Sequence, residues 1–202
     1  MGRPVHRPDP IGEGAQVIFE PGGLSGVVVI SPDRHADDRG FFARTWCARE
    51  FAAAGLPSTL AQCSVSWNEH RYTMRGLHWE APPQRESKIV RCTRGAIFDV
   101  IVDLRPTSPS YLSNIGLSLT ADDHRAVFIP PGMAHGFLTL IERTEVLYQM
   151  DSFYAPEAER GARWDDPAFG IEWPAAPAVI SVRDRGFPDF AGDFPNEVPC
   201  TR

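Results

Sequence analysis

A chain of 202 residues can form one domain with a sizeable core, and its 19 prolines and 17 glycines predict many turns and argue against a helical bundle. The formal net charge of −6 offers no general basic surface for nucleic acid, and no apolar stretch reaches the roughly 18 residues that a membrane-spanning helix needs. We therefore expect one globular domain that binds neither nucleic acid nor a membrane.

The N-terminal part of the chain changes character near residue 17. Residues 1–16 are rich in proline and charge and lack an apolar run, so we expect a flexible arm before a single domain over residues 17–202. Gly26–Ile30 is largely β-branched and predicts the first strand. Phe41–Trp46 predicts an edge strand with an exposed arginine at its mouth.

One helix and a series of strands are expected next. Ala48–Ala54 favours a helix, which Gly55 and Pro57 would end. Beyond it, strand-like runs bounded by turn residues recur about every ten residues, a spacing typical of an antiparallel barrel or sandwich. These runs are Thr59–Ser66, Thr73–Trp79, Ser87–Cys92, Ala96–Leu104, Ile115–Leu119, Ala126–Ile129, Gly136–Leu140 and Glu145–Asp151.

Turn residues predict how these strands connect. Gly95, Pro106–Pro109 and the pair Asp122 and Asp123 are each expected to close a hairpin. After Pro156 the strand pattern fades. We expect the remaining tail to wrap the barrel and to carry Asp184 back toward it.

The cysteines indicate the redox compartment. Cys47, Cys63, Cys92 and Cys200 show neither C-x-x-C spacing nor a regular framework. Reduced thiols in a cytoplasmic protein are the simplest interpretation.

The turn Pro130-Pro131-Gly132-Met133-Ala134-His135 resembles the second signature of cupin barrels, P-x-G-x-x-H, which implies that His135 lines a cavity. In many cupins this histidine binds a metal together with an H-x-H pair. The matching strand here offers only His78, whereas a catalytic metal normally needs three or four protein ligands. We therefore expect no metal, and acid-base or hydrogen-bonding roles for both histidines. A lone strand histidine is more often structural, so His78 needs support from elsewhere in the chain.

Two strand residues are further candidates for the cavity. Alternation places Asp99 on the face opposite Phe98, so it lies either in a cavity beside a partner such as a histidine or in solvent, and the residues alone leave both open. Tyr148 lies in the last predicted strand. A phenol with a reference pKa of about 10 stays protonated at neutral pH and can donate a proton, although most strand tyrosines are packing residues.

From about Val27 to Phe190 the chain resembles the family of dTDP-4-dehydrorhamnose 3,5-epimerases and related nucleotide-sugar 3-epimerases, which are metal-free cupins. The resemblance implies an all-β, cupin-type antiparallel barrel, or jelly roll, with a few short helices. Its motifs are Asp38-Arg39-Gly40-Phe41-Phe42, Arg75-Gly76-Leu77-His78, Lys88-Ile89-Val90-Arg91-Cys92, Ala134-His135-Gly136-Phe137, Ile171-Glu172-Trp173-Pro174 and Arg183-Asp184.

The resemblance implies epimerisation at C3 and C5 of a dTDP-4-keto-6-deoxyhexose. His78 would remove the proton and Asp184 would orient the imidazole. Tyr148 would return a proton on the opposite face of the sugar, and Lys88 would stabilise the enolate oxygen. Because a ketone already acidifies the adjacent C–H bonds, this chemistry needs no metal and no redox cofactor.

The resemblance also implies sites for the nucleotide. Arg39, Gln62 and Arg75 match positions that contact the diphosphate, sugar or base, and arginine suits phosphate through its forked donors. Because the family often supplies the first motif from a neighbouring subunit, a homodimer is implied in which Arg39 and Phe42 act in trans. The cavity residues His135 and Asp99 complete the expected substrate-binding set.

Departures from the family pattern keep alternatives open. Arg44 replaces a common glutamate, Ser64 a common asparagine and Trp79 a more usual phenylalanine. A C3-only epimerase, or an enzyme for another nucleoside diphosphate, is the first alternative. A metal-dependent cupin and a non-catalytic sugar-binding cupin are the alternatives from other classes.

Strand geometry adds one condition. Arg75 and His78 are three residues apart and would point to opposite faces of a regular strand. We therefore expect a bulge at Gly76, or a subunit boundary that uses both faces.

Overall fold

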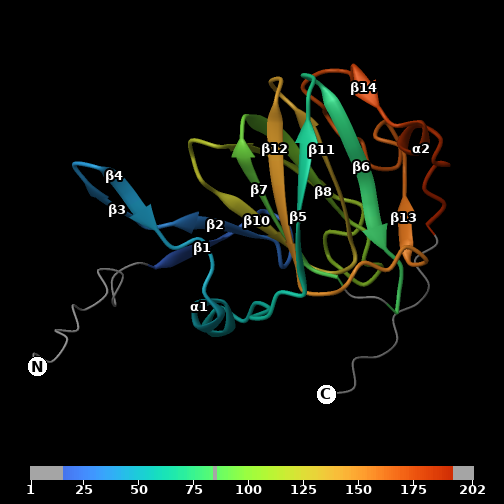
Figure 1. The fold of residues 1–202 in the computed structure, drawn as a ribbon. Helices are drawn as coiled ribbons and strands as arrows, with labels where there is room; N and C mark the ends of the chain where they lie inside the picture. Colours follow the sequence, from blue (N-terminus) through green and yellow to red (C-terminus); the bar gives the residue numbers. More distant parts are fainter. Residues whose placement is uncertain (1–15, 84–85, 193–202) are drawn as a thin grey trace, which may run out of the picture.

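The computed structural model describes residues 16–83 and 86–192, and two antiparallel sheets dominate this part of the chain (Figure 1). The first sheet has the strand order β1-β2-β10-β7-β12-β5, so most neighbours in it are distant in sequence. Its strands are β1 (Val17–Pro21), β2 (Val28–Pro32), β10 (Ala126–Ile129), β7 (Lys88–Arg94), β12 (Thr144–Met150) and β5 (Gln62–Asn68).

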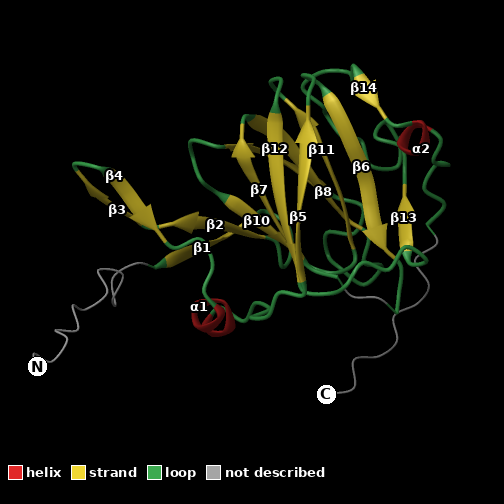
Figure 2. Cartoon of the chain, viewed as in Figure 1, coloured by secondary structure: helices red, strands yellow, loops and turns green. Residues whose placement is uncertain are grey.

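The second sheet has the order β13-β6-β11-β8-β9, and β14 adds a parallel pairing to β6. A separate hairpin of β3 and β4 projects from the two sheets (Figure 2). The strands are β13 (Glu159–Gly161), β6 (Thr73–Glu80), β11 (Met133–Thr139), β8 (Ala96–Asp103), β9 (Asn114–Thr120), β14 (Val179–Ile180), β3 (Arg34–Asp37) and β4 (Gly40–Ala43).

Apolar residues from both sheets share one core. Val90 and Val146 from the first sheet pack with Ile101 and Phe137 from the second, and all four are fully buried. Because side chains alternate between the two faces of a strand, each sheet presents one row of apolar residues to the other. The prediction of an all-β, antiparallel, cupin-type jelly roll with short helices is confirmed.

The N-terminal strands differ from the prediction. The predicted run Gly26–Ile30 is present as β2, which begins at Val28, but it is the second strand. β1 precedes it and pairs with it, with Val17 opposite Pro32. The expected edge strand Phe41–Trp46 is shorter, ends at Ala43 and pairs only with β3. Residues 1–15 of the expected arm lie outside the described part.

Two of the three predicted hairpins are wrong. Gly95 separates β7 from β8, and the pair Asp122 and Asp123 separates β9 from β10, but in each case the two strands belong to different sheets. Both turns are therefore corners at which the chain crosses between sheets. Only the turn at Pro106–Pro109 joins paired strands, β8 and β9.

In the described part of the chain, two short helices flank the sheets. The predicted helix is present as α1 (Ala48–Ala53), whose buried Phe51 packs edge-on against Phe19. A second helix, α2 (Val182–Arg185), follows β14 and lies beside β6 (Figure 1). The C-terminal tail therefore returns to the barrel as predicted. Within residues 16–83 and 86–192 no helix is long and apolar enough to cross a membrane.

The predicted free thiols are present at Cys47, Cys63 and Cys92. Cys200 lies outside the described residues.

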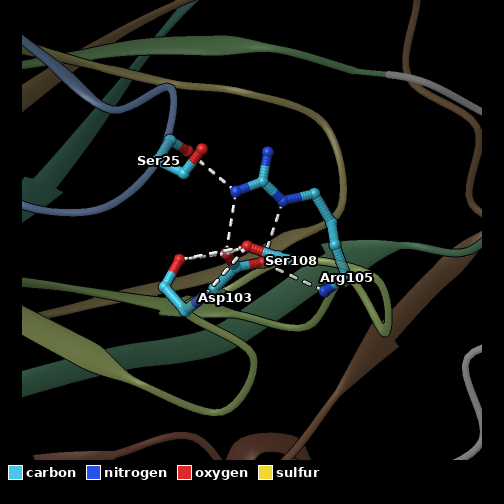
Figure 3. A network of polar contacts seen from close by, with 5 residues as sticks. Ser25, Asp103, Arg105 and Ser108 are labelled. Carbon is cyan, nitrogen blue, oxygen red and sulfur yellow. Dashed lines mark hydrogen bonds and ion pairs between the residues drawn. The ribbon is translucent and has the colours of Figure 1, made fainter.

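A buried carboxylate fixes the end of β8 (Figure 3). Asp103 is 0% exposed and accepts hydrogen bonds from Arg105 Nε at 2.8 Å, Ser108 Oγ at 2.5 Å and Ser110 Oγ at 2.6 Å. Arg105 also donates to the Ser25 carbonyl at 2.7 Å, which ties the loop after β1 to this corner. Burial raises the pKa of Asp103, but these donors outweigh it and lower the pKa to about 2.

Replacing Asp103 by asparagine is expected to lower the free energy of unfolding by on the order of 3 kcal/mol, because the partly buried Arg105 loses its carboxylate. The native pKa of about 2 lies below the ordinary 3.8, so this stabilisation is present above pH 3.8 and is lost as the pH falls through about 2. Urea denaturation of wild type and Asp103→Asn, repeated at pH values from about 2 to about 7, measures the loss of stability and its pH dependence. Equal midpoints for wild type and Asp103→Asn at neutral pH would contradict this role.

Candidate active site

A distortion of β6 lets residues three apart face one cavity. His78 lies opposite His135 in the pairing of β6 with β11, whereas Arg75 lies opposite Phe137, and the register shifts between these positions. At the shift Gly76 has φ 105°, and an added Cβ would come within 2.6 Å of the His135 carbonyl oxygen, so a side chain does not fit. The expected bulge at Gly76 is confirmed, and both Arg75 and His78 line the cavity.

The cavity has a volume of about 640 Å³ and is lined from both sheets. His78 comes from β6, whereas Lys88 on β7 and Tyr148 on β12 belong to the facing sheet, and Asp184 arrives on α2. A second cavity of about 360 Å³ shares His78, Lys88 and Tyr148 and is also lined by Gln62. The three shared side chains therefore stand at the junction of the two cavities.

His78 and Asp184 form a hydrogen-bonded pair. His78 Nε2 lies 2.9 Å from Asp184 Oδ1, and the buried carboxylate also accepts the Gly76 N–H at 3.2 Å. Burial raises the pKa of Asp184, but the hydrogen bond and charge of His78 outweigh it, so the net pKa lies below its ordinary value. An ionised Asp184 favours the tautomer with the proton on Nε2. Since no described residue bonds Nδ1, that nitrogen can act as the base.

Tyr148 provides a neutral phenol on the opposite sheet. Burial, and then the charge of Asp99, raise the pKa of Tyr148 above its ordinary value, whereas Arg75 and a hydrogen bond with Ser66 act in the other direction. The phenol therefore stays protonated at neutral pH and can serve as a proton donor.

Lys88 is held between carboxyl groups. Its Nζ lies 2.9 Å from Glu86 Oε1, and both side chains are largely buried. Burial, and then the charge of Glu86, raise the pKa of Glu80, and Lys88 opposes this change. The ammonium is thereby kept at the wall of both cavities, where it can stabilise a negative oxygen.

A second histidine–aspartate pair lies deeper in the barrel. His135 Nε2 is 2.7 Å from Asp99 Oδ1, and both residues are buried, so Asp99 is not in solvent. His135 lines the larger cavity, and Asp99 supports it from behind. In the described part of the chain, no group of three or more His, Cys, Asp or Glu side chains is arranged to hold a metal ion.

Arg75 is aimed by its neighbours. Its Nε donates to Asn68 Oδ1 at 2.7 Å, and its Nη2 donates to the Trp67 carbonyl at 3.2 Å. These bonds hold the guanidinium at the larger cavity, where it can meet a phosphate.

Two expected substrate-binding residues are not brought to the cavity within one chain. Arg39 has 89% of its side chain exposed and pairs with Asp37, and Phe42 is 49% exposed. Both lie in the β3–β4 hairpin, which points away from β6 and α2 (Figure 1). The structure of a single chain therefore leaves the predicted contribution of these residues to a partner subunit untested.

Several cavity residues were not predicted. Ser66, Arg183 and Glu80 line one or other cavity. Alternation along β5 could have identified Ser66, because it shares a strand face with Gln62. Arg183 belongs to the family motif Arg183-Asp184, but the motif gave it no role of its own. Glu80 had no signal beyond its position two residues after His78.

The chain matches the family model described as dTDP-4-dehydrorhamnose 3,5-epimerase over residues 22–192. It is 41% identical over 167 residues to the dTDP-4-dehydrorhamnose 3,5-epimerase of Pseudomonas aeruginosa, covering 82% of this chain and 91% of that protein. It is 38% identical over 168 residues to the dTDP-4-dehydrorhamnose 3-epimerase of Streptomyces niveus, covering 83% of this chain and 81% of that protein.

Solved structures give the same result. A dTDP-4-dehydrorhamnose 3,5-epimerase from Bacillus anthracis, crystallised with TDP and pyrophosphate bound, superposes with a TM-score of 0.83 at 34% identity, covering 87% of this chain and all of that one. The fold and these matches define an isomerase of the cupin type. The chain belongs to the dTDP-4-dehydrorhamnose 3,5-epimerase family.

Proposed function

We propose that the protein epimerises a dTDP-4-keto-6-deoxyhexose at C3 and C5, next to the C4 ketone. The observation that carries this proposal is the placement of His78 and Tyr148 on facing sheets around one cavity, with Lys88 beside them. Inversion of a carbon centre needs a base on one face and an acid on the other, and this arrangement supplies both. The names of the relatives support the nucleotide and the sugar.

The reaction begins with proton transfer to His78. Nδ1 removes the C3 proton, the C–H electron pair moves into the C3–C4 bond, and the C4 carbonyl oxygen becomes an enolate. Asp184 stabilises the imidazolium that forms, and the Lys88 ammonium stabilises the enolate oxygen. Tyr148 then donates its phenolic proton to C3 from the opposite face, and solvent restores the protonation of both residues. The same groups repeat these steps at C5.

Arg75 and Gln62 are proposed to bind the rest of the substrate. The Arg75 guanidinium lines the larger cavity and suits the diphosphate, whereas Gln62 lies in the smaller cavity. His135, held by Asp99, would donate a hydrogen bond to the sugar. The free thiols fit our placement of the enzyme in the cytoplasm.

We further propose a homodimer in which the β3–β4 hairpin of each subunit completes the site of the other. Arg39 and Phe42 are largely exposed on this projecting hairpin, although they match family positions that bind substrate. Val65 and Trp67 on β5 add exposed apolar surface to the outer face of the first sheet, which a second copy can cover.

Mixing two inactive variants tests this arrangement. Arg39→Ala and His78→Asn are each expected to be inactive, but a mixed dimer contains one site with an intact His78 and an intact Arg39 from its partner. Activity should therefore reappear when the two variants are unfolded and refolded together, with separately refolded samples as the control. If Arg39 acts within its own chain, no site in the mixed dimer is intact and activity stays absent.

Incubation of dTDP-4-keto-6-deoxyglucose in D₂O, followed by NMR, tests the function itself. The proposal predicts deuterium at C3 and C5 together with the inverted product. Deuterium at C3 alone would select the 3-epimerase reaction named for the Streptomyces niveus relative. Deuterium at neither carbon, with nucleotide still bound, would contradict catalysis on this substrate and favour a sugar-binding protein.

A further inference from the structure

Phe187 packs against the imidazole of His78 from outside the two cavities. The ring centroids are 5.9 Å apart with an interplanar angle of 74°, an edge-to-face contact. Phe187 belongs to the lining of neither cavity. Its ring therefore contacts the imidazole without lining either cavity.

The position of Phe187 depends on a glycine in the neighbouring strand. Gly161 on β13 pairs directly with His78 on β6. A Cβ added at Gly161 would come within 2.3 Å of Phe187 Cε2 and Cζ, so the ring occupies the space that a side chain would fill. The absence of a side chain at Gly161 thus allows the phenyl ring to reach His78.

A cation also lies over the same ring. The Arg183 guanidinium lies 5.5 Å from the centroid of the Phe187 ring. Arg183 is itself fixed by an ion pair with Glu159 at 2.8 Å, and Glu159 accepts a hydrogen bond from the Tyr154 hydroxyl at 2.9 Å. Phe187 is therefore confined between His78, Gly161 and Arg183.

We propose that Phe187 is a positioning residue for His78. Asp184 holds only one ring nitrogen, and one hydrogen bond leaves the imidazole free to tilt about that bond. The edge-to-face contact limits this tilt, keeps Nδ1 directed at the cavity and shields the outer side of the ring from water. This inference rests on the proposed function, in which His78 is the base.

A double-mutant cycle of Phe187→Ala and Gly161→Ala tests the proposal. The first change removes the ring and the second displaces it, so each should lower kcat by about tenfold, as small misplacements of reacting groups do. KM and the Kd for dTDP should change less than twofold, because neither residue lines either of the two cavities that His78 lines. In the double variant the new Cβ meets no ring, so the loss should be no larger than for Phe187→Ala alone.

The chain contains a matched control in Phe98 and Gly116. Phe98 also makes an edge-to-face contact, with Trp173 at 6.1 Å, and a Cβ at Gly116 would come within 2.1 Å of its Cζ. Phe98→Ala and Gly116→Ala remove or displace a similar ring away from His78 and should leave kcat unchanged. An equal fall of kcat in these controls, or an unchanged kcat in both Phe187→Ala and Gly161→Ala, would overturn the proposal.

A second measurement does not depend on turnover. Modification of His78 by diethylpyrocarbonate, followed by peptide mass spectrometry, should become several-fold faster in Phe187→Ala relative to the exposed His70 of the same molecule. An unchanged relative rate would overturn the shielding role. If wild type fails to exchange deuterium into the sugar, the proposed function fails, whereas this ratio still decides whether Phe187 shields His78.

Discussion

Replacement of His78 by asparagine is expected to lower the rate of epimerisation by about 10³-fold, because general acid–base catalysis typically contributes about 10²- to 10⁴-fold. His78 Nδ1 is the nitrogen left to the cavity once Nε2 is bonded to Asp184. Asparagine is a polar side chain somewhat smaller than histidine, and it has no basic nitrogen. Both the formation of product and the exchange of the C3 hydrogen with D₂O should therefore stop together, which NMR can follow.

His70→Asn is the matched control for this substitution. His70 is exposed and belongs to the lining of neither cavity, so its replacement should leave exchange at the wild-type rate. Exchange at the wild-type rate in His78→Asn would show that another group removes the proton. The second pair, His135 with Asp99, would then be the group to examine.

Replacement of Tyr148 by phenylalanine is expected to separate exchange from inversion. The phenyl ring keeps the packing of β12 while the proton donor is lost, so the rate of inversion should fall by about 10²-fold. His78 can still remove the C3 proton and return a deuteron to the same face. Deuterium should therefore enter at C3 of recovered substrate much faster than the inverted product forms.

The ratio of these two rates is the diagnostic quantity for Tyr148→Phe. Tyr111→Phe removes a hydroxyl from a half-buried tyrosine outside both cavities and should leave the ratio unchanged. If Tyr148→Phe slows exchange and inversion equally, the phenol acts before or during proton removal, and its assignment as the acid on the second face is wrong.

Local patterns predicted most of the strands in the second half of the chain. β10 (Ala126–Ile129) has the predicted bounds, and α1 ends one residue before the predicted position. Both elements have clear stop signals in the sequence. The connections were harder to predict, because a residue such as Gly95 shows that the chain turns but not whether the next strand joins the same sheet.

The candidate site shows the same division between local and distant information. Family motifs identified His78, Lys88, Tyr148 and Asp184, and the structure brings all four to one cavity. The bulge could be expected from the sequence, because three-residue spacing conflicts with strand alternation unless Gly76 distorts β6.

Contacts that depend on the return of the tail could not be predicted. Phe187 reaches His78 across more than a hundred residues, and its place is set by Gly161 on a third element. Nothing in the local sequence around Phe187 indicates this neighbour. Arg39 and Phe42 present the opposite case, because their motif was clear but the described chain alone does not bring them to the cavity.

A crystal structure of the wild-type protein with a dTDP-linked 6-deoxyhexose bound would test the central claim most directly. We predict that His78 Nδ1 and the Tyr148 hydroxyl lie on opposite faces of the hexose ring, each within about 3.5 Å of C3, as near-attack geometry requires. Lys88 Nζ should lie beside the oxygen on C4. A sugar with both groups on the same face, or bound away from His78, would contradict the proposed reaction.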